Sequence, residues 1–395
     1  MKEDDLVGML LELDPSLQAQ QAARCVAVAA SSLESTSDPK SGVFDCKALL
    51  AWLWDEVPGA EQPAAQVDAE PAAASTAAKI SPEISVDEDG KELRVMICSC
   101  LGQEGAPVSP SRSQGLQKVQ KSPEKSRTAE KTLEALREKI REYPDAEKLE
   151  IDVRHFKGFK STADVFQGLP LSSVKHLALD LTGCTSLTAT SLPSLPCLQH
   201  LQINLTGCKG LSSLYGLGQS LAAQTGLKTL QLIFAECLAL RSLEGLALAK
   251  GLESCQLDLS GCERLEDISH LEECLCTKEL RDLQVKLTAC TSLKKLDFMG
   301  PGLEALQQLS IDAKECRCLT DVSNLGRTLK DMTRLRDLRL NCFGCSSLLD
   351  VSPLQTGLAQ LSAIDSLKLN FYGCTQLPPG AKGIFTSREK FLSAA

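Results

Sequence analysis

One pattern recurs in four stretches of the chain: LALDLTGCTSL (177–187), LQINLTGCKGL (201–211), LQVKLTACTSL (283–293) and LKLNFYGCTQL (367–377). Four more fit with substitutions: LQLIFAECLAL (230–240), CQLDLSGCERL (255–265), LSIDAKECRCL (309–319) and LRLNCFGCSSL (338–348). An earlier copy is LEIDVRHFKGF (149–159). Alternation of leucine with other residues predicts a β-strand that turns its leucines to one side and the intervening residues to the other.

One marker residue identifies each of the nine units: Phe156, Cys184, Cys208, Cys237, Cys262, Cys290, Cys316, Cys345 and Cys374. Successive markers are 24 to 29 residues apart, within the range of leucine-rich repeats. The chain therefore resembles the leucine-rich-repeat family, and LDLSGCERLED (257–267) resembles its cysteine-containing subclass. The resemblance implies an α/β fold, a curved solenoid with a parallel sheet on its concave side and helical or irregular return segments. Stacking is expected because one unit cannot bury its own leucines.

The repeats are expected over residues 146–378, and the flanking composition suggests four further parts. Residues 1–58 have apolar residues at helical spacing and predict a small helical segment. Residues 59–123 are rich in Ala, Pro, Glu, Ser and Gln and predict a mostly disordered linker, in which Leu93–Cys98 is a candidate strand or docking segment. Residues 124–145 predict a capping helix with Leu133, Leu136 and Ile140 on one face. Residues 379–395 form a C-terminal tail.

Charge and cysteine usage restrict the class of protein. A formal net charge of -9 and a pI of about 5.2 argue against nucleic acid as the main partner, because phosphates demand a basic surface. The N-terminus shows no signal peptide and no stretch predicts a membrane-spanning helix, so we expect a cytoplasmic protein with reduced thiols. Cys342 and Cys345 have metal-site spacing, but the repeat explains both as core residues. We therefore expect no metal and no cofactor.

The residues between the leucines predict a partner-binding surface. Glutamine stands six residues before the marker in four units: Gln202, Gln231, Gln256 and Gln284. The last two units instead carry a mixed cluster: Arg339, Asn341, Phe343, Lys368, Asn370 and Tyr372. Exposed aromatic residues beside arginine are typical of binding hot spots, so the main contact is predicted there. The alternative is that Phe343 and Tyr372 pack beneath the tail as part of a cap.

The function predicted from these features is a non-enzymatic scaffold or adaptor that binds a protein partner through the concave face. No catalytic motif is recognised. Because some proteins with this repeat are substrate receptors, the alternative is the substrate-recognition subunit of a ubiquitin ligase, although residues 1–58 do not show a clear F-box.

Two further sets of side chains stand out in the sequence. His176 and His200 share a register and should be neighbours. Ser109 and Ser122 precede prolines and are candidate phosphorylation sites.

Overall fold

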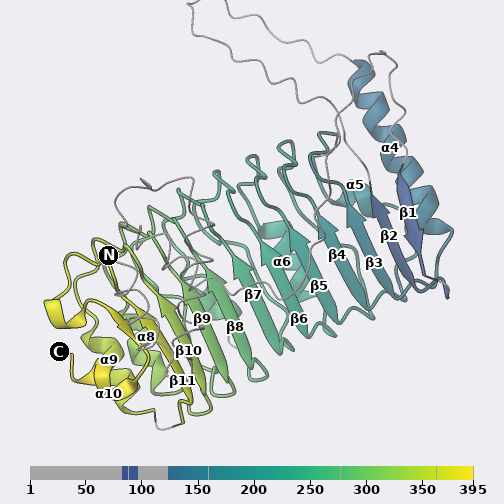
Figure 1. Ribbon diagram of the computed structural model, residues 1–395. Helices are drawn as coiled ribbons and strands as arrows, with labels where there is room; N and C mark the ends of the chain where they lie inside the picture. The colour runs from purple at the N-terminus through teal and green to yellow at the C-terminus, as the bar shows by residue number, and fades with distance from the viewer. Residues whose placement is uncertain are drawn as a thin grey trace, which may run out of the picture. The chain divides into compact units, whose positions relative to one another are not determined.

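The computed structural model describes residues 82–96 and 123–394, apart from residues 88, 159, 276 and 362. All of these fall within one compact unit, Ala78–Ala395. In this part of the chain, twelve strands form a single sheet in chain order, from β1 to β12 (Figure 1). Strands β2 (Glu92–Met96) to β11 (Ser366–Asn370) run parallel, whereas β1 (Glu83–Val86) and β12 (Ile384–Phe385) pair antiparallel at the two edges.

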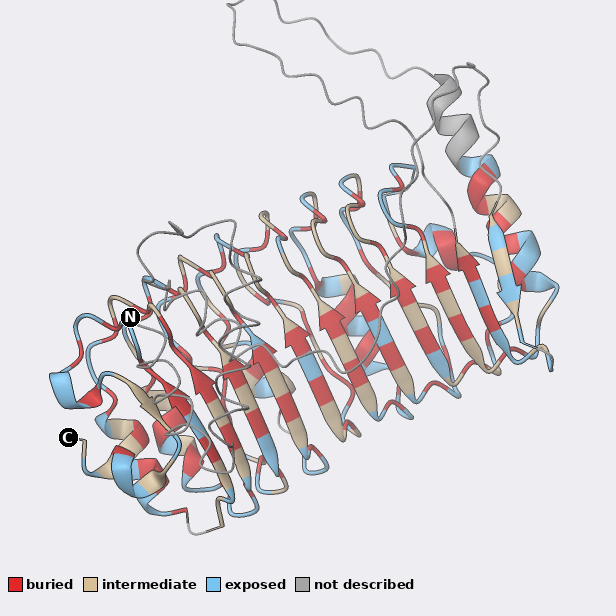
Figure 2. Ribbon diagram, viewed as in Figure 1, coloured by how far each residue is buried: buried red, intermediate tan, exposed pale blue. Residues whose placement is uncertain are grey.

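The strands predicted from the repeats are observed, and each pairs with the next in matching register. Between β2 and β11 lie β3 (Lys148–Asp152), β4 (His176–Asp180), β5 (His200–Asn204), β6 (Thr229–Ile233), β7 (Ser254–Asp258), β8 (Asp282–Lys286), β9 (Gln308–Asp312) and β10 (Asp337–Asn341). The second and fourth residues of these strands are buried, and Figure 2 shows the alternation along each strand. One register therefore places all the leucines on one face of the sheet.

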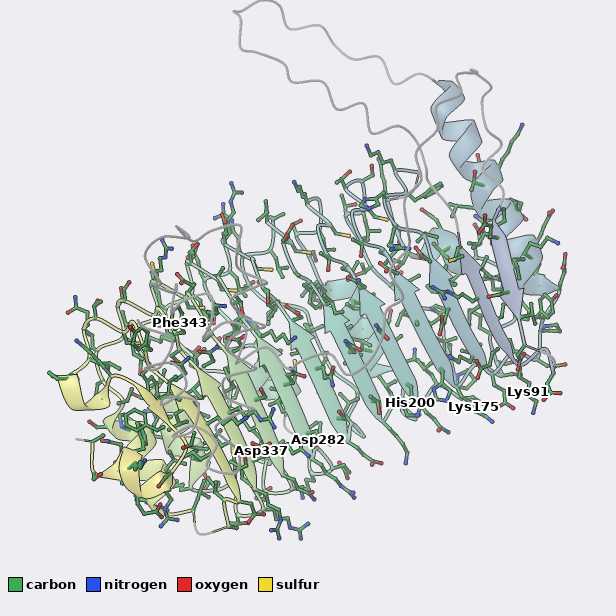
Figure 3. All side chains as sticks on the ribbon, viewed as in Figure 1. Lys91, Lys175, His200, Asp282, Asp337 and Phe343 are labelled. Carbon is green, nitrogen blue, oxygen red and sulfur yellow. The ribbon has the colours of Figure 1, made fainter. Side chains whose placement is uncertain are left out.

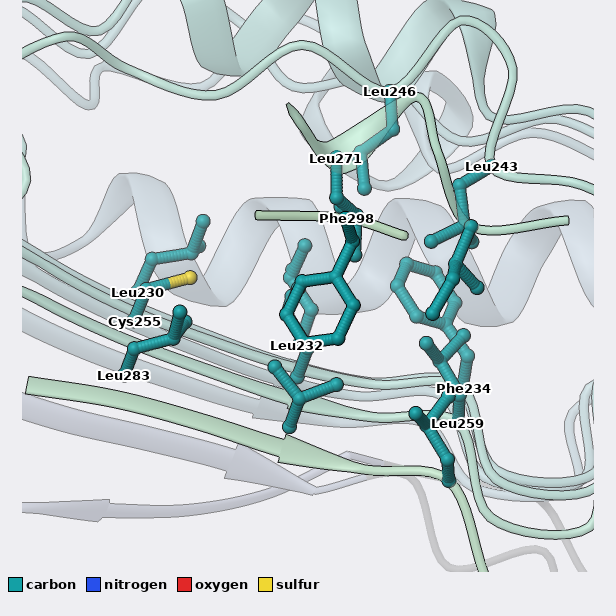
Figure 4. Close-up of a cluster of buried hydrophobic side chains, with 14 of the residues drawn as sticks. Leu230, Leu232, Phe234, Leu243, Leu246, Cys255, Leu259, Leu271, Leu283 and Phe298 are labelled. Carbon is teal, nitrogen blue, oxygen red and sulfur yellow. The ribbon is translucent and has the colours of Figure 1, made fainter. Parts of the chain in front are cut away.

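The core is a stack of equivalent side chains between the sheet and the return segments. Leu230, Cys255 and Leu283 occupy one position in successive strands and lie together, all at most 2% exposed (Figure 4). Short helices occur in several return segments and bury apolar side chains against this stack: α5 (Ala163–Phe166), α6 (Tyr215–Ala222), α7 (Leu271–Cys274), α8 (Ser323–Leu329) and α9 (Ser352–Ala359). The predicted helical or irregular returns are thus seen.

The first repeat is covered by α4 (Pro123–Arg141) and by the β1–β2 hairpin. Leu133, Leu136 and Ile140 of α4 are buried, on the face expected from their spacing. The structure corrects the expectation of a mostly disordered linker for Glu83–Met96. β2 covers residues 93–96 of the candidate strand, whose last two residues lie outside the described residues, whereas β1 was not expected. The hairpin is stabilised because Leu93 and Val95 extend the buried rows of the repeats by one more strand.

The tail after the last repeat folds back as a cap. It contains a 3-10 turn η1 (Pro379–Ala381), β12 and the helix α10 (Arg388–Leu392). Phe391 is fully buried, and its ring lies 5.7 Å from that of Phe371 and 5.1 Å from that of Phe385. These rings close the C-terminal end of the leucine stack. The predicted helical segment 1–58 and the serines Ser109 and Ser122 lie outside the described residues.

Candidate functional site

The solvent-facing side of the sheet carries three rows of side chains, from the first, third and fifth residues of each strand. We call them the strand-start, central and strand-end rows. From β3 to β11 the central row reads Glu150, Ala178, Gln202, Gln231, Gln256, Gln284, Ser310, Arg339 and Lys368. Register pairing places the four glutamines side by side on β5, β6, β7 and β8. All four are at least partly exposed.

The strand-end row has a structural role in most repeats. Asp180 Oδ1 accepts the backbone N–H of Thr182 at 3.0 Å, and Asn204 Oδ1 accepts that of Thr206 at 3.1 Å. The same bond, from the N–H two residues further on, recurs in β7, β9, β10 and β11. Such side chains stabilise the turn that follows the strand. In β6 this row is occupied by Ile233, which cannot accept the bond.

The marker cysteines belong to the core and join neighbouring repeats. Each donates a hydrogen bond from Sγ to a backbone carbonyl of the preceding repeat, as Cys208 does to Leu181 at 3.3 Å and Cys290 to Leu259 at 3.1 Å. Burial raises the pKa of the Cys184 thiol to about 12 and that of Cys208 to about 11. A protonated thiol is the form that can donate. Cys342 and Cys345 are likewise fully buried.

The predicted C-terminal cluster is only partly exposed. Asn341 and Asn370 are 2% exposed and Phe343 is 6% exposed, so the prediction that these three side chains face solvent is wrong. The two amide oxygens accept the N–H groups of Phe343 and Tyr372, which holds them against the strand ends. Figure 3 labels Phe343 beyond the end of its strand. Of the two predicted aromatic contacts, Phe343 is therefore removed from the accessible surface.

The remaining members of that cluster stay accessible to different degrees. Tyr372 is 50% exposed and stacks on Phe343 with ring centroids 6.0 Å apart. It is therefore not packed beneath the tail, and the cap is built from other rings. Arg339 Nη2 lies 3.0 Å from Asp337 Oδ2, so its charge is balanced within its own strand. Lys368 is exposed beside it.

Two histidines form a stacked pair in the strand-start row. His176 and His200 are direct neighbours in the register of β4 and β5, as predicted, and their rings lie 4.3 Å apart and nearly parallel at 4°. Burial, and then the charge on His200, lowers the pKa of His176. The pair lines a shallow hollow that Gln202 and Gln231 also border. The strand-start row is visible along one edge of the sheet in Figure 3, where His200, Asp282 and Asp337 are labelled.

A second hollow lies among the glutamines. It measures about 140 Å³ and is lined by side chains of β6, β7 and β8, among them Gln231, Ile233, Gln256 and Gln284. Ile233 was not among the predicted contacts. The signal that could have identified it is a break in composition: it is the one aliphatic residue in a strand-end row that elsewhere, from β3 to β11, holds Asp, Asn or Lys.

Residues 228–325 match the family model of the leucine-rich-repeat domain of the endo-β-N-acetylglucosaminidase EndoS. The fold is a leucine-rich-repeat solenoid. The matched residues include β6 to β9, the part of the solenoid that carries three of the four glutamines and Ile233. No curated protein matches the chain. Solenoids of this kind present extended surfaces that bind other proteins. Within the described residues of this solenoid, no helix is long and apolar enough to span a membrane.

Proposed function

We propose that this chain is a non-enzymatic scaffold or adaptor that binds a protein partner through the exposed face of its repeat sheet, without a metal or cofactor. The observation that carries the proposal is the row Gln202, Gln231, Gln256 and Gln284 on four adjacent strands. The underlying leucines are almost completely buried, so the row is held on a rigid support. A rigid, solvated face suits recognition because little conformational entropy is lost on binding.

The state of the cysteines supports a cytoplasmic location and the cysteine-containing subclass of repeats. All thirteen cysteines in the described part of the chain are free thiols, as is usual in a reducing compartment. The marker thiols donate equivalent bonds in successive repeats, which gives the cysteine a structural reason to recur. The ubiquitin-ligase alternative depends on a ligase-binding segment in residues 1–58, for which the described residues supply no support.

The proposal is tested by affinity capture from cytosolic extract with mass spectrometry, using the full chain. The test variant is Gln231→Glu/Gln256→Glu. The matched control, Gln219→Glu/Gln360→Glu, adds the same charge at exposed positions on return segments. Circular dichroism verifies that all three proteins fold. We expect specific partners with the wild type and the control and their loss with the test variant. If the test variant captures the same partners, the contact lies outside the glutamine row.

A further inference from the structure

The exposed sheet face is divided by charge into an uncharged centre and charged ends. We define the neutral patch as the uncharged side chains around β6: Gln202, Thr229, Gln231, Ile233, Ala235 and Gln256. On its N-terminal side, Lys148 pairs with Glu92 at 3.2 Å and Arg94 with Glu150 at 3.6 Å. The depletion of charge at the centre of a surface with a polar rim is the pattern found in binding interfaces.

On the other side of the patch, the strand-end row alternates in sign. Asp258, Lys286 and Asp312 are consecutive neighbours in the register of β7, β8 and β9. Each charge therefore has an opposite charge beside it, and the row does not require a counter-charge from a partner. Asp258 and Lys286 also line the hollow beside Ile233, and their opposite charges leave no net charge at its rim. A charged group placed on the neutral patch would therefore lose hydration and would meet a like charge as well as an opposite one. The charge distribution thus favours an uncharged ligand.

Ile233 gives the patch a specific apolar contact. It is partly exposed, stands where the neighbouring strands have Asn204 and Asp258, and lines the hollow of about 140 Å³. A cavity of about 150 Å³ accommodates a group the size of benzene. The hollow is therefore large enough for one aliphatic side chain of a partner, whose burial against Ile233 would supply hydrophobic stabilisation.

The glutamines supply the polar complement. A primary amide both donates and accepts hydrogen bonds, as the backbone of an extended polypeptide requires. In the described part of the chain, the side chains that bond to the strand ends are those of Asp and Asn, and the four glutamine amides take no part in those bonds. Four adjacent strands span about 14 Å, which is the length of about four extended residues.

We propose that the neutral patch binds an extended, uncharged segment of a partner polypeptide. The segment crosses the neutral patch from β5 to β7 and extends to Gln284 on β8. Its backbone bonds to the glutamine amides, and one aliphatic side chain enters the hollow beside Ile233. This inference rests on the proposed function and deepens it, because it specifies the chemistry of the partner and the strands that it contacts.

The decisive variant is Ile233→Asp. It introduces the residue that the neighbouring strand carries at Asp258, so the new carboxylate can accept the N–H of Ala235 as its neighbours do, and the fold should be retained. The same change places a charge in the neutral patch. Ile233→Val is the matched control, because it keeps an aliphatic side chain at this position. Thermal unfolding of both proteins checks that stability is comparable with that of the wild type.

The probe is a displayed library of random peptides of about 12 residues, longer than the span of the patch at 3.3 Å per residue. It is selected against the full wild-type chain, and enriched peptides are then titrated against the variants. We expect enriched peptides to have an uncharged centre with an aliphatic residue, and affinity to fall about tenfold or more, at least about 1.4 kcal/mol, with Ile233→Asp but not with Ile233→Val.

Three results would overturn the inference. The enriched peptides could have charged centres, Ile233→Asp could leave their binding unchanged, or selection against the protein could enrich no peptide beyond a mock selection without the protein. The proposed function is judged separately by capture from extract. Partners that depend on the glutamine row but resist Ile233→Asp would retain the scaffold function and reject the extended neutral segment. If partner capture survives both Gln231→Glu/Gln256→Glu and Ile233→Asp, the contact lies outside the glutamine row and the neutral patch, and both proposals about this surface are rejected.

Discussion

The Sγ atom of Cys290 lies 3.1 Å from the carbonyl oxygen of Leu259 and donates a hydrogen bond to it. The same carbonyl accepts the backbone N–H of Cys262 at 3.1 Å. One oxygen therefore joins the turn of its own repeat to the thiol of the next. Because the arrangement recurs in consecutive repeats, the cysteines act as a ladder of bonds through the core.

Replacement of one ladder thiol should destabilise the solenoid. For Cys290→Ala we expect the free energy of unfolding to fall by about 1–2 kcal/mol, through loss of the bond and a small cavity. Urea unfolding followed by circular dichroism measures the change. Cys318→Ala is the control, since Cys318 is exposed. Equal effects of the two substitutions would show that the buried bond contributes nothing.

Alkylation should distinguish the ladder thiols from the surface thiols. Burial raises the pKa of Cys184 to about 12 and of Cys374 to about 12, and only the thiolate reacts. At about pH 8, iodoacetamide should modify the exposed Cys197 and Cys318 well before the ladder positions. Peptide mapping by mass spectrometry identifies the sites, and labelling in urea provides full reaction. Rapid native labelling of Cys184 would contradict the buried ladder.

The residue before each marker adopts a left-handed conformation, which constrains the turn. Gly183 has φ +70°, and a Cβ atom there would lie 2.2 Å from Nδ1 of His155. Gly183→Ala should therefore cost about 1–3 kcal/mol. Ala289, with φ +60°, provides the inverse test: Ala289→Gly should be neutral or stabilise by about 1 kcal/mol. Thermal and urea unfolding measure both, and the same sign for the two changes would contradict this account.

The histidine pair should make stability depend on pH. The pKa of His176 is lowered in the folded state, so the unfolded chain binds its proton more readily. The contribution to stability is present above the unfolded pKa and is lost as pH falls through the unfolded and then the folded value. Urea unfolding between about pH 7 and about pH 5 should show this loss.

The variant His176→Gln isolates the contribution of the histidine pair to the pH dependence of stability. His176→Gln should flatten the pH dependence over that range, whereas Gln219→Ala, which changes an exposed side chain without a titratable group, should leave it unchanged. An unaltered profile for His176→Gln would mean that other groups account for the acid sensitivity.

The C-terminal cap should protect the last repeats. Phe391→Ala removes a fully buried ring from the contact with Phe371 and Phe385, at a cost of about 3–5 kcal/mol. Because each repeat contacts only its neighbours, hydrogen exchange should increase most in β11 and β12 and least near β3. The control is Lys390→Ala, on the exposed side of α10. A uniform increase along the chain would show that the cap acts globally.

Sequence periodicity was sufficient for the strands but not for the exposure of particular side chains. Alternation assigned Leu338 and Leu340 to the core and placed Phe343 and Asn341 on the opposite side, because direction alternates along a strand. It could not show that Asn341 would bond to the backbone of Phe343 at 3.1 Å and be buried. β1 was missed because its four residues alternate too briefly to be distinguished from the surrounding polar sequence.

The sequence by itself determined the repeat, its register and the composition of each row. Leucines at every second position of a strand can all be buried only if they lie on the same face of the sheet. The tertiary structure decided what repetition leaves open: which strand begins the sheet, how the tail closes it, and which solvent-side residues remain accessible. Those outcomes depend on contacts between segments far apart in the chain, such as Phe391 on Phe371. The sequence contains the uncharged residues of the neutral patch around Ile233, but the in-register pairing of the strands places them on one surface.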